Sequence, residues 1–159
     1  MPGVRAESEA TVKAAYLLNF AKLVDWPASA FPNGQALVVG VVGHEPVGDE
    51  ILRTLPGASA HGHRIEVRRV AAGDMAALRA CHVLFVPASE RGEGIVAAVQ
   101  GRPILTVGDA EDFVRRGGAL GYVKEGDNVK FEANPKTASR NGLTVSAKLL
   151  RVARSVIQN

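Results

Sequence analysis

Residues 36–43 read ALVVGVVG, an uninterrupted apolar run that is rich in valine. A strand with apolar residues on both of its faces is typical of a parallel sheet that helices cover on both sides. The next residues favour such a helix, because Pro46 suits its first turn and Ile51 and Leu55 recur at helical spacing. The run therefore predicts a strand followed by a helix, which is the repeating unit of α/β proteins.

The same alternation continues along the chain. We expect further strands at residues 64–70, 82–87 and 102–108, and the alternating charges of the first of these place it nearer an edge. A short helix that Asp74 caps is expected between the first two of these strands. Another is expected after the last strand, at residues 110–116, with Asp109 as its cap. Strands that alternate with helices imply right-handed crossovers and a mainly parallel sheet.

The pattern changes after residue 118. Residues 119–133, ALGYVKEGDNVKFEA, contain two alternating strands around a Gly-Asp turn, which predicts a hairpin. Asn134 and Pro135 begin a helix, and a last helix starts at Thr144 or Ser146 and runs through Ile157. We expect an α/β fold: a mainly parallel sheet flanked by helices, with an antiparallel hairpin at one edge. One domain covers residues 9–157, and residues 1–8 form a short segment from which a leader is expected to have been removed.

Residues 12–27, VKAAYLLNFAKLVDWP, are largely apolar yet contain four polar or charged side chains. The longest uncharged run, residues 14–21, is far shorter than the 18–20 residues that a membrane span needs. The spacing predicts an amphipathic helix that Pro27 ends. Lys13 falls within its apolar arc, where it either pairs with Glu9 one turn earlier or contacts a partner subunit.

The composition excludes several classes of protein. Of the 159 residues, 47% are hydrophobic and 22% are charged, which is a normal globular balance. The formal charge of +3 is modest, and no basic cluster carries interleaved aromatic residues, so nucleic-acid binding is not expected. From Phe113 onward the sequence contains nine Lys and Arg residues but only three acidic residues. That excess is either a basic face for an acidic partner or a solvated helix surface.

Cysteine and histidine indicate neither a metal nor a redox centre. Cys81 is the only cysteine and precedes an apolar run, so it is expected to be a buried thiol. His61 and His63 could share a metal ion, but no third ligand lies close in sequence, so they are interpreted as part of a polar loop. We therefore expect no cofactor and no metal.

Polar residues follow three of the predicted strands. If these strands are neighbours, the polar groups converge at one rim, where open parallel sheets usually bind ligands. A Ser–His–acid triad could be written from Ser89, His44 and Asp109, but their spacing does not demand one and no nucleophile-elbow motif is present. A binding module is favoured over an enzyme. The candidate ligand rim consists of Gly43, His44, Ser89, Glu90 and Asp109.

Four segments resemble, in the same order, the YfiR-like (HmsC-like) family of bacterial periplasmic proteins. They are residues 12–27, residues 81–90 (CHVLFVPASE), residues 101–134 (GRPILTVGDAEDFVRRGGALGYVKEGDNVKFEAN) and residues 141–154 (NGLTVSAKLLRVAR). The resemblance covers residues 9–157 and implies a mixed α/β fold, a homodimer and a regulator rather than an enzyme. Some relatives carry several cysteines and form disulfides, which Cys81 alone cannot do.

The resemblance also implies partners. Such regulators bind the periplasmic domain of an inner-membrane diguanylate cyclase and repress it, which lowers cyclic-di-GMP and biofilm formation. An OmpA-like outer-membrane lipoprotein can sequester the regulator. The alternative is a periplasmic small-molecule binding protein without a cyclase partner. The residues that match the family's first helix, and are expected to form a partner or dimer surface, are Lys13, Tyr16, Asn19 and Phe20.

Overall fold

A computed structural model describes residues 2–90 and 92–158, with the backbone alone for residues 2–8. Its helices are α1 (Pro2–Leu23), α2 (Pro46–Thr54), α3 (Met75–Arg79), α4 (Gly92–Val99), α5 (Pro135–Arg140) and α6 (Ala147–Val152), with the 3-10 turns η1 (Ala28–Ala30) and η2 (Pro32–Gly34). Its strands are β1 (Val24–Asp25), β2 (Leu37–Val42), β3 (Ser59–Ala60), β4 (His63–Val70), β5 (Val83–Val86), β6 (Leu105–Gly108), β7 (Leu120–Glu125), β8 (Asn128–Ala133), β9 (Thr144–Val145) and β10 (Ser155–Val156).

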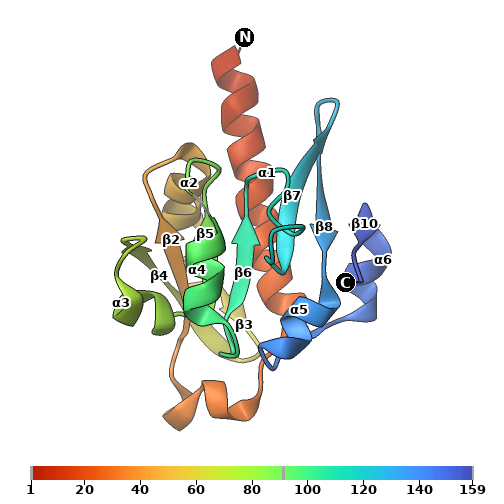
Figure 1. Cartoon of the computed structure of the whole chain (residues 1–159). Helices are drawn as coiled ribbons and strands as arrows, with labels where there is room; N and C mark the ends of the chain where they lie inside the picture. Colours follow the sequence, from red (N-terminus) through yellow and green to blue (C-terminus); the bar gives the residue numbers. More distant parts are fainter. Residues whose placement is uncertain (1, 91, 159) are drawn as a thin grey trace.

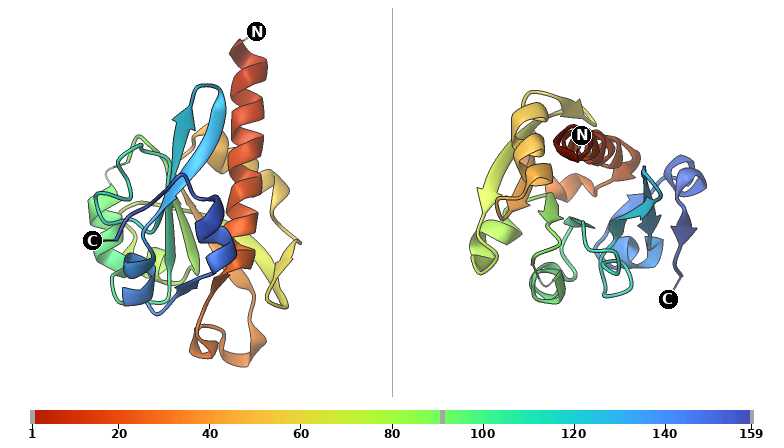
Figure 2. Two further views of the ribbon diagram at one scale, coloured as in Figure 1. Left: turned by 90° about the vertical axis from the view of Figure 1, so that its right-hand side faces the viewer. Right: turned by 90° about the horizontal axis from the view of Figure 1, so that it is seen from above.

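Most of the strands form one sheet, in the order β10-β8-β7-β6-β5-β2-β4-β3. Strands β4, β2, β5, β6 and β7 run parallel, whereas β7 and β8 form the antiparallel hairpin. Helices α1 and α2 cover one face of the sheet, and α3 and α4 cover the other (Figures 1 and 2). The predicted fold is therefore confirmed: a mixed α/β protein with a mainly parallel sheet between helices.

Strand β2 explains why its sequence is apolar throughout. Val39 and Val41 belong to the hydrophobic cluster on the side of α1, and Val38 and Val42 belong to the cluster on the side of α4. Successive side chains of a strand point to opposite faces, so a central strand must be apolar at every position. At Gly40 a Cβ atom would lie 2.6 Å from the sulfur of Cys81, so the sheet has no room for a side chain there.

Helix α1 is a core helix along its second half. Phe20 is fully buried, and its ring lies 5.0 Å from that of Phe131 and 5.9 Å from that of Tyr122. The helix ends at Leu23 rather than near Pro27, because the next two residues leave it to pair with β9. Among the described residues, none of the helices combines the length and the apolar character needed to cross a membrane.

Two predicted helices are wrong in extent. Residues 110–117 form successive turns instead of a helix, and Asp109 does not cap them. The last helix does start after Ser146, whose hydroxyl accepts from the amide of Leu149. It stops at Val152, because the following residues pair with β8 as strand β10.

Candidate functional site

Strands β2, β5 and β6 are neighbours in the sheet, so their carboxyl ends meet at one rim. Gly43 directly follows β2 and Asp109 directly follows β6, while Ser89 and Glu90 follow β5 within four residues. The topology therefore brings together the chain segments that carry the predicted ligand residues. This rim lies at the upper end of the sheet in Figure 1, beside the projecting part of α1.

The side chains at this rim do not assemble a catalytic triad. The hydroxyl of Ser89 donates to the carboxylate of Glu45 at 2.8 Å, and Asp109 is bound to a lysine of α1. No hydrogen bond joins Ser89, His44 and Asp109 within the part of the chain that the structure describes. A hollow of about 400 Å³ is lined by Gly43, His44 and Glu90 of the predicted rim.

Asp109 belongs to a chain of charges that ties α1 to the rim. The ammonium of Lys13 lies 2.6 Å from Asp109 and 3.1 Å from Glu9, and the other carboxylate oxygen of Glu9 lies 2.9 Å from Lys124. We call Glu9, Lys13, Asp109 and Lys124 the Lys13 network. The sequence left two explanations for Lys13 on the apolar face, a pairing with Glu9 or a contact with a partner subunit. The structure shows the pairing with Glu9.

Burial sets the electrostatics of this network. It raises the pKa of Asp109, against the opposing effect of the Lys13 ammonium. Burial alone would lower the pKa of Lys13, but the hydrogen bonds and charges of Asp109 and Glu9 outweigh it and raise that pKa. The hydrogen bond from Lys124 is the main cause that lowers the pKa of Glu9. The lysine is therefore held as a cation between carboxylates.

The four residues predicted as a partner surface lie on different sides of α1. Lys13 and Phe20 are buried inside the chain. Tyr16 is half-buried and its hydroxyl donates to the carbonyl of Val129 at 3.1 Å, whereas Asn19 is exposed. Of the four, Asn19 and the edge of Tyr16 are the ones that another molecule can reach.

An exposed stripe on α1 surrounds Asn19. We call Val12, Ala15, Asn19 and Lys22 the α1 stripe; all four are exposed and follow one another at helical spacing. Val12 is 40% exposed although its spacing groups it with the apolar residues of the helix. It borders a groove of about 310 Å³ between α1 and the β7–β8 hairpin. Helix periodicity identifies an apolar face but does not show where the covering sheet ends.

Histidines anchor the loop between α1 and β2. His82 accepts from the amide of Val38 through Nδ1 at 2.9 Å and donates from Nε2 to the carbonyl of Ala30 at 2.7 Å. The ring of Phe31 stacks on both His63 and His82, with centroids at 3.9 and 4.4 Å. This role of His82 was missed, because the sequence shows it only as the first residue of a buried strand.

The remaining histidine has its own backbone partners. The Nε2 atom of His61 lies 2.9 Å from the carbonyl of Ala21 and 2.7 Å from that of Val24. Within residues 2–90 and 92–158, no three His, Cys, Asp or Glu side chains are grouped so that they could hold a metal ion.

Several cations of the basic C-terminal third are paired within the chain. Arg116 contacts Glu93 at 3.1 Å and Asp112 at 2.7 Å, and Arg154 contacts Glu125 at 2.7 Å. Exposed ion pairs of this kind contribute little to stability, about 0–1 kcal/mol each.

Two solved structures share the fold. One is a conserved domain protein from Vibrio cholerae O1 biovar El Tor strain N16961, with 16% sequence identity and a TM-score of 0.59 over 91% of this chain. The other is the ABC domain in complex with L-Trp from Streptococcus pneumonia, with 15% identity and a TM-score of 0.58 over 81% of this chain. The matches span 60% and 57% of those longer chains. At such low identity they show the fold alone.

The sequence itself gives the family. A family model described as YfiR/HmsC-like matches residues 10–154, which includes most of α1, the strands β1 to β9 and α6. The matched region contains the Lys13 network except Glu9, together with the whole α1 stripe. The chain belongs to the YfiR/HmsC-like family.

Proposed function

We propose that the chain is a periplasmic regulatory protein that binds the periplasmic domain of an inner-membrane diguanylate cyclase and represses it. Repression would lower cyclic-di-GMP and biofilm formation. The family match over residues 10–154 carries this proposal, because it supports a periplasmic regulator of diguanylate cyclase signalling in general. The family is regulatory rather than catalytic, and the rim side chains are bonded in ways that do not suit a triad.

The projecting part of α1 is the docking surface in this proposal. Its amino-terminal half extends beyond the sheet beside the β7–β8 hairpin, as two views show (Figures 1 and 2). The α1 stripe begins beside this projecting part with the exposed Val12 and continues along the helix to the exposed amide of Asn19. Lys13 and Phe20, which match the family's helix signature, hold the helix from behind through buried contacts. Exposed apolar groups beside polar ones suit a protein interface.

Repression would work by linkage. The regulator binds one state of the cyclase better than the other and so shifts the population towards that state. A second partner, such as an OmpA-like outer-membrane lipoprotein, would release the cyclase by competing for the regulator. A homodimer would present the α1 stripe twice.

The test is a pull-down with the periplasmic domain of a diguanylate cyclase from the same organism. The variant Val12→Glu should weaken binding by about tenfold or more, because it places a charge in the contact. Met75→Glu is the matched control, since that methionine is 45% exposed on α3, which covers the other face of the sheet. Equal binding by both variants and the parent chain would remove α1 from the contact. Absence of binding by the parent chain would refute the cyclase partner.

A second candidate function is a periplasmic small-molecule binding protein without a cyclase partner. The hollow of about 400 Å³ beside Gly43, His44 and Glu90 favours it, because open parallel sheets bind ligands at this edge. Calorimetry with metabolite pools separates the two candidates. Heat that His44→Ala abolishes, together with a negative cyclase pull-down, would favour the second.

A further inference from the structure

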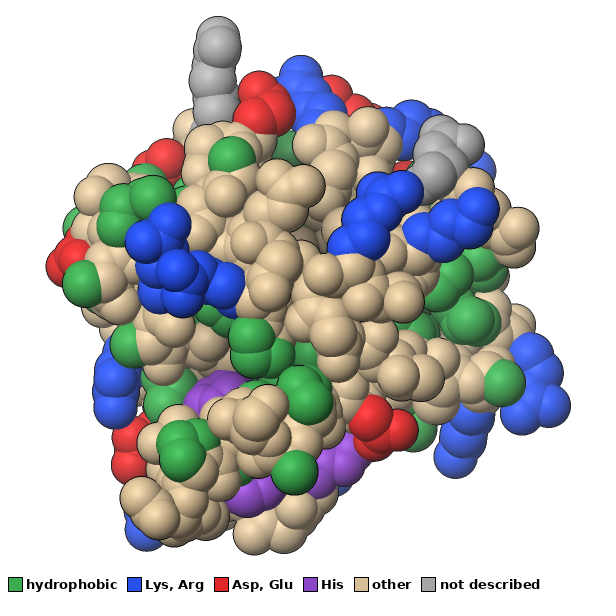
Figure 3. Space-filling view, turned by 60° about the horizontal axis from the view of Figure 1, so that its bottom comes forward, with side chains coloured by type: hydrophobic (Ala, Val, Ile, Leu, Met, Phe, Trp, Pro, Cys, Tyr) green, Lys and Arg blue, Asp and Glu red, His purple; other side chains and the backbone are tan. Residues whose placement is uncertain are grey.

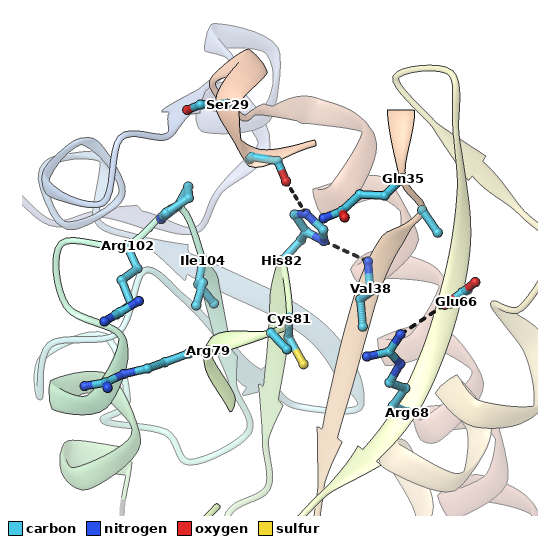
Figure 4. Close-up of a pocket in the computed structure, with 14 residues that line it drawn as sticks. Ser29, Gln35, Val38, Glu66, Arg68, Arg79, Cys81, His82, Arg102 and Ile104 are labelled. Carbon is cyan, nitrogen blue, oxygen red and sulfur yellow. Dashed lines mark hydrogen bonds and ion pairs between the residues drawn. The ribbon is translucent and has the colours of Figure 1, made fainter. Parts of the chain in front are cut away.

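A cavity of about 580 Å³ opens at the edge of the sheet opposite the rim. It lies where β2, β5 and β6 begin, beneath the loop that carries η1, and Figure 4 shows its lining. This underside of the molecule carries hydrophobic and histidine side chains with Lys and Arg side chains set around them (Figure 3). The volume is within the range of about 300–1,000 Å³ that small-molecule sites occupy.

Three guanidinium groups line this cavity and come from separate parts of the fold. Arg68 lies on β4, Arg79 ends α3, and Arg102 follows α4. In Figure 4, Arg79 and Arg102 extend on one side of Cys81 and Arg68 lies on the other. Glu66 is the one carboxylate among the lining residues, so the cavity carries an excess of positive charge.

These arginines keep most of their donors available. The guanidinium of Arg102 has no hydrogen-bond or ion-pair partner within the described residues. Arg79 donates to the carbonyl of Ala98 through Nε at 2.9 Å, which leaves its two terminal amino groups. Arg68 lies 3.4 Å from Glu66, a long contact between exposed side chains. A guanidinium binds phosphate or carboxylate through two parallel hydrogen bonds, so such free donors suit an oxyanion.

The wall of the cavity between these arginines is fixed and uncharged. His82 is held through both ring nitrogens, by Val38 and Ala30. Burial raises the pKa of the neighbouring Cys81 thiol to about 11, so no thiolate forms near neutral pH to compete with a bound anion. Because this wall is already ordered, the protein loses little conformational entropy there when a ligand binds.

We propose that this cavity binds a small anion bearing phosphate or carboxylate groups through Arg68, Arg79 and Arg102. It lies at the edge opposite the one where open parallel sheets usually bind ligands. The inference does not depend on the cyclase partner, since it rests on the cavity and its charges alone.

The test is titration of the full chain with pyrophosphate and, separately, with citrate in a phosphate-free buffer of low salt. Calorimetry should show saturable binding of at least one probe that added salt weakens, and the amide signals of Gln35, Cys81 and Ile104 should shift in NMR spectra. Binding of pyrophosphate alone assigns the site to phosphates, and binding of citrate alone assigns it to carboxylates. If neither probe binds saturably, the proposal is wrong.

Substitutions of single arginines test whether the probe anion binds in this cavity. Arg102→Gln should weaken it about tenfold or more, because a charge-assisted contact is lost. This variant removes no internal hydrogen bond of the described structure, so the fold should persist, which circular dichroism checks. Arg151→Gln is the matched control, an exposed arginine on α6. Equal weakening in both variants would mean non-specific attraction to positive charge and would overturn the site.

Discussion

Lys13 is the residue at which the sequence left two explanations open. It is 5% exposed and bridges two carboxylates. Glu9 lies four residues earlier on its own helix, and Asp109 lies 96 residues later, directly after β6. The spacing of four residues made Glu9 predictable, whereas Asp109 was not, because the contact depends on how α1 crosses the sheet. A buried cation with two carboxylate partners fixes the position of the helix along the sheet.

Removing this cation should be costly. Lys13→Met leaves Asp109 without its main partner, and we expect a loss of about 2–4 kcal/mol in the free energy of unfolding. The double variant with Asp109→Asn should recover part of that loss, since the uncompensated carboxylate is gone. Urea denaturation of the four proteins in this cycle measures both values. Additive effects would show that the two residues are not coupled.

His82 predicts a pH dependence of stability. Burial lowers its pKa below the ordinary 6.5, so the folded chain keeps the ring neutral where the unfolded chain is already protonated. The stabilisation is therefore present above pH 6.5 and is lost as the pH falls, by at most about 1.4 kcal/mol per pH unit down to the folded pKa. Protonation would also remove the Nδ1 acceptor that Val38 uses.

Thermal unfolding at several pH values between 5 and 8 measures this effect. His82→Gln should be less stable at pH 8 and should flatten the slope below pH 6.5. An unchanged slope would assign the dependence to other groups.

At the scale of elements, the segment after β6 shows why a helix was wrongly predicted. The turns at residues 110–117 place the ring of Phe113 directly over Gly108 and Gly118, where any Cβ atom would overlap it. A Gly-Gly pair such as Gly117-Gly118 is typical of the end of a helix, which favoured the prediction of a helix at residues 110–116. Its second glycine instead makes room for an aromatic ring, a contact that local sequence patterns do not reveal.

Two alanine substitutions test whether a glycine is needed to leave space for the ring of Phe113. Gly108→Ala should destabilise the chain by about 1–3 kcal/mol or more, because Phe113 must move. Gly94→Ala should be neutral or stabilise it by up to about 1 kcal/mol, since that helical glycine has nothing within 4 Å of the added atom. Denaturation midpoints measure the difference. Equal effects would mean that the ring adapts without cost.

A prediction for helix α1 concerns the assembly of two chains into a homodimer. The alternative to cyclase docking is that the α1 stripe is itself the homodimer contact. In that case Ala15→Arg should convert the dimer to a monomer with an unchanged circular dichroism spectrum, because a large charge enters the contact. Light scattering measures the mass. Ala76→Arg, at an exposed position of α3, should leave it unchanged. A persistent dimer in the Ala15 variant would place the interface elsewhere.

For the whole molecule, the sequence predicted the architecture better than the surfaces. Continuous apolar runs and helix caps are local signals, and they located the central strands, the hairpin and the cap at Asp74. The short pairings of β1 with β9 and of β10 with β8 join segments that are distant in sequence, so no local pattern predicted them. The cavity lined by Arg68, Arg79 and Arg102 was missed for the same reason: its charges converge only after folding.

The pairing of Val24 with Val145 has a consequence for how the chain is made. Strand β1, which directly follows the first helix, can pair only after residue 145 has been synthesised, so the carboxyl end of that helix is locked late. A ribosome-bound fragment that stops before Thr144 would leave Val24 and Asp25 without their strand partner, so a truncation there would loosen the chain more than a hundred residues upstream.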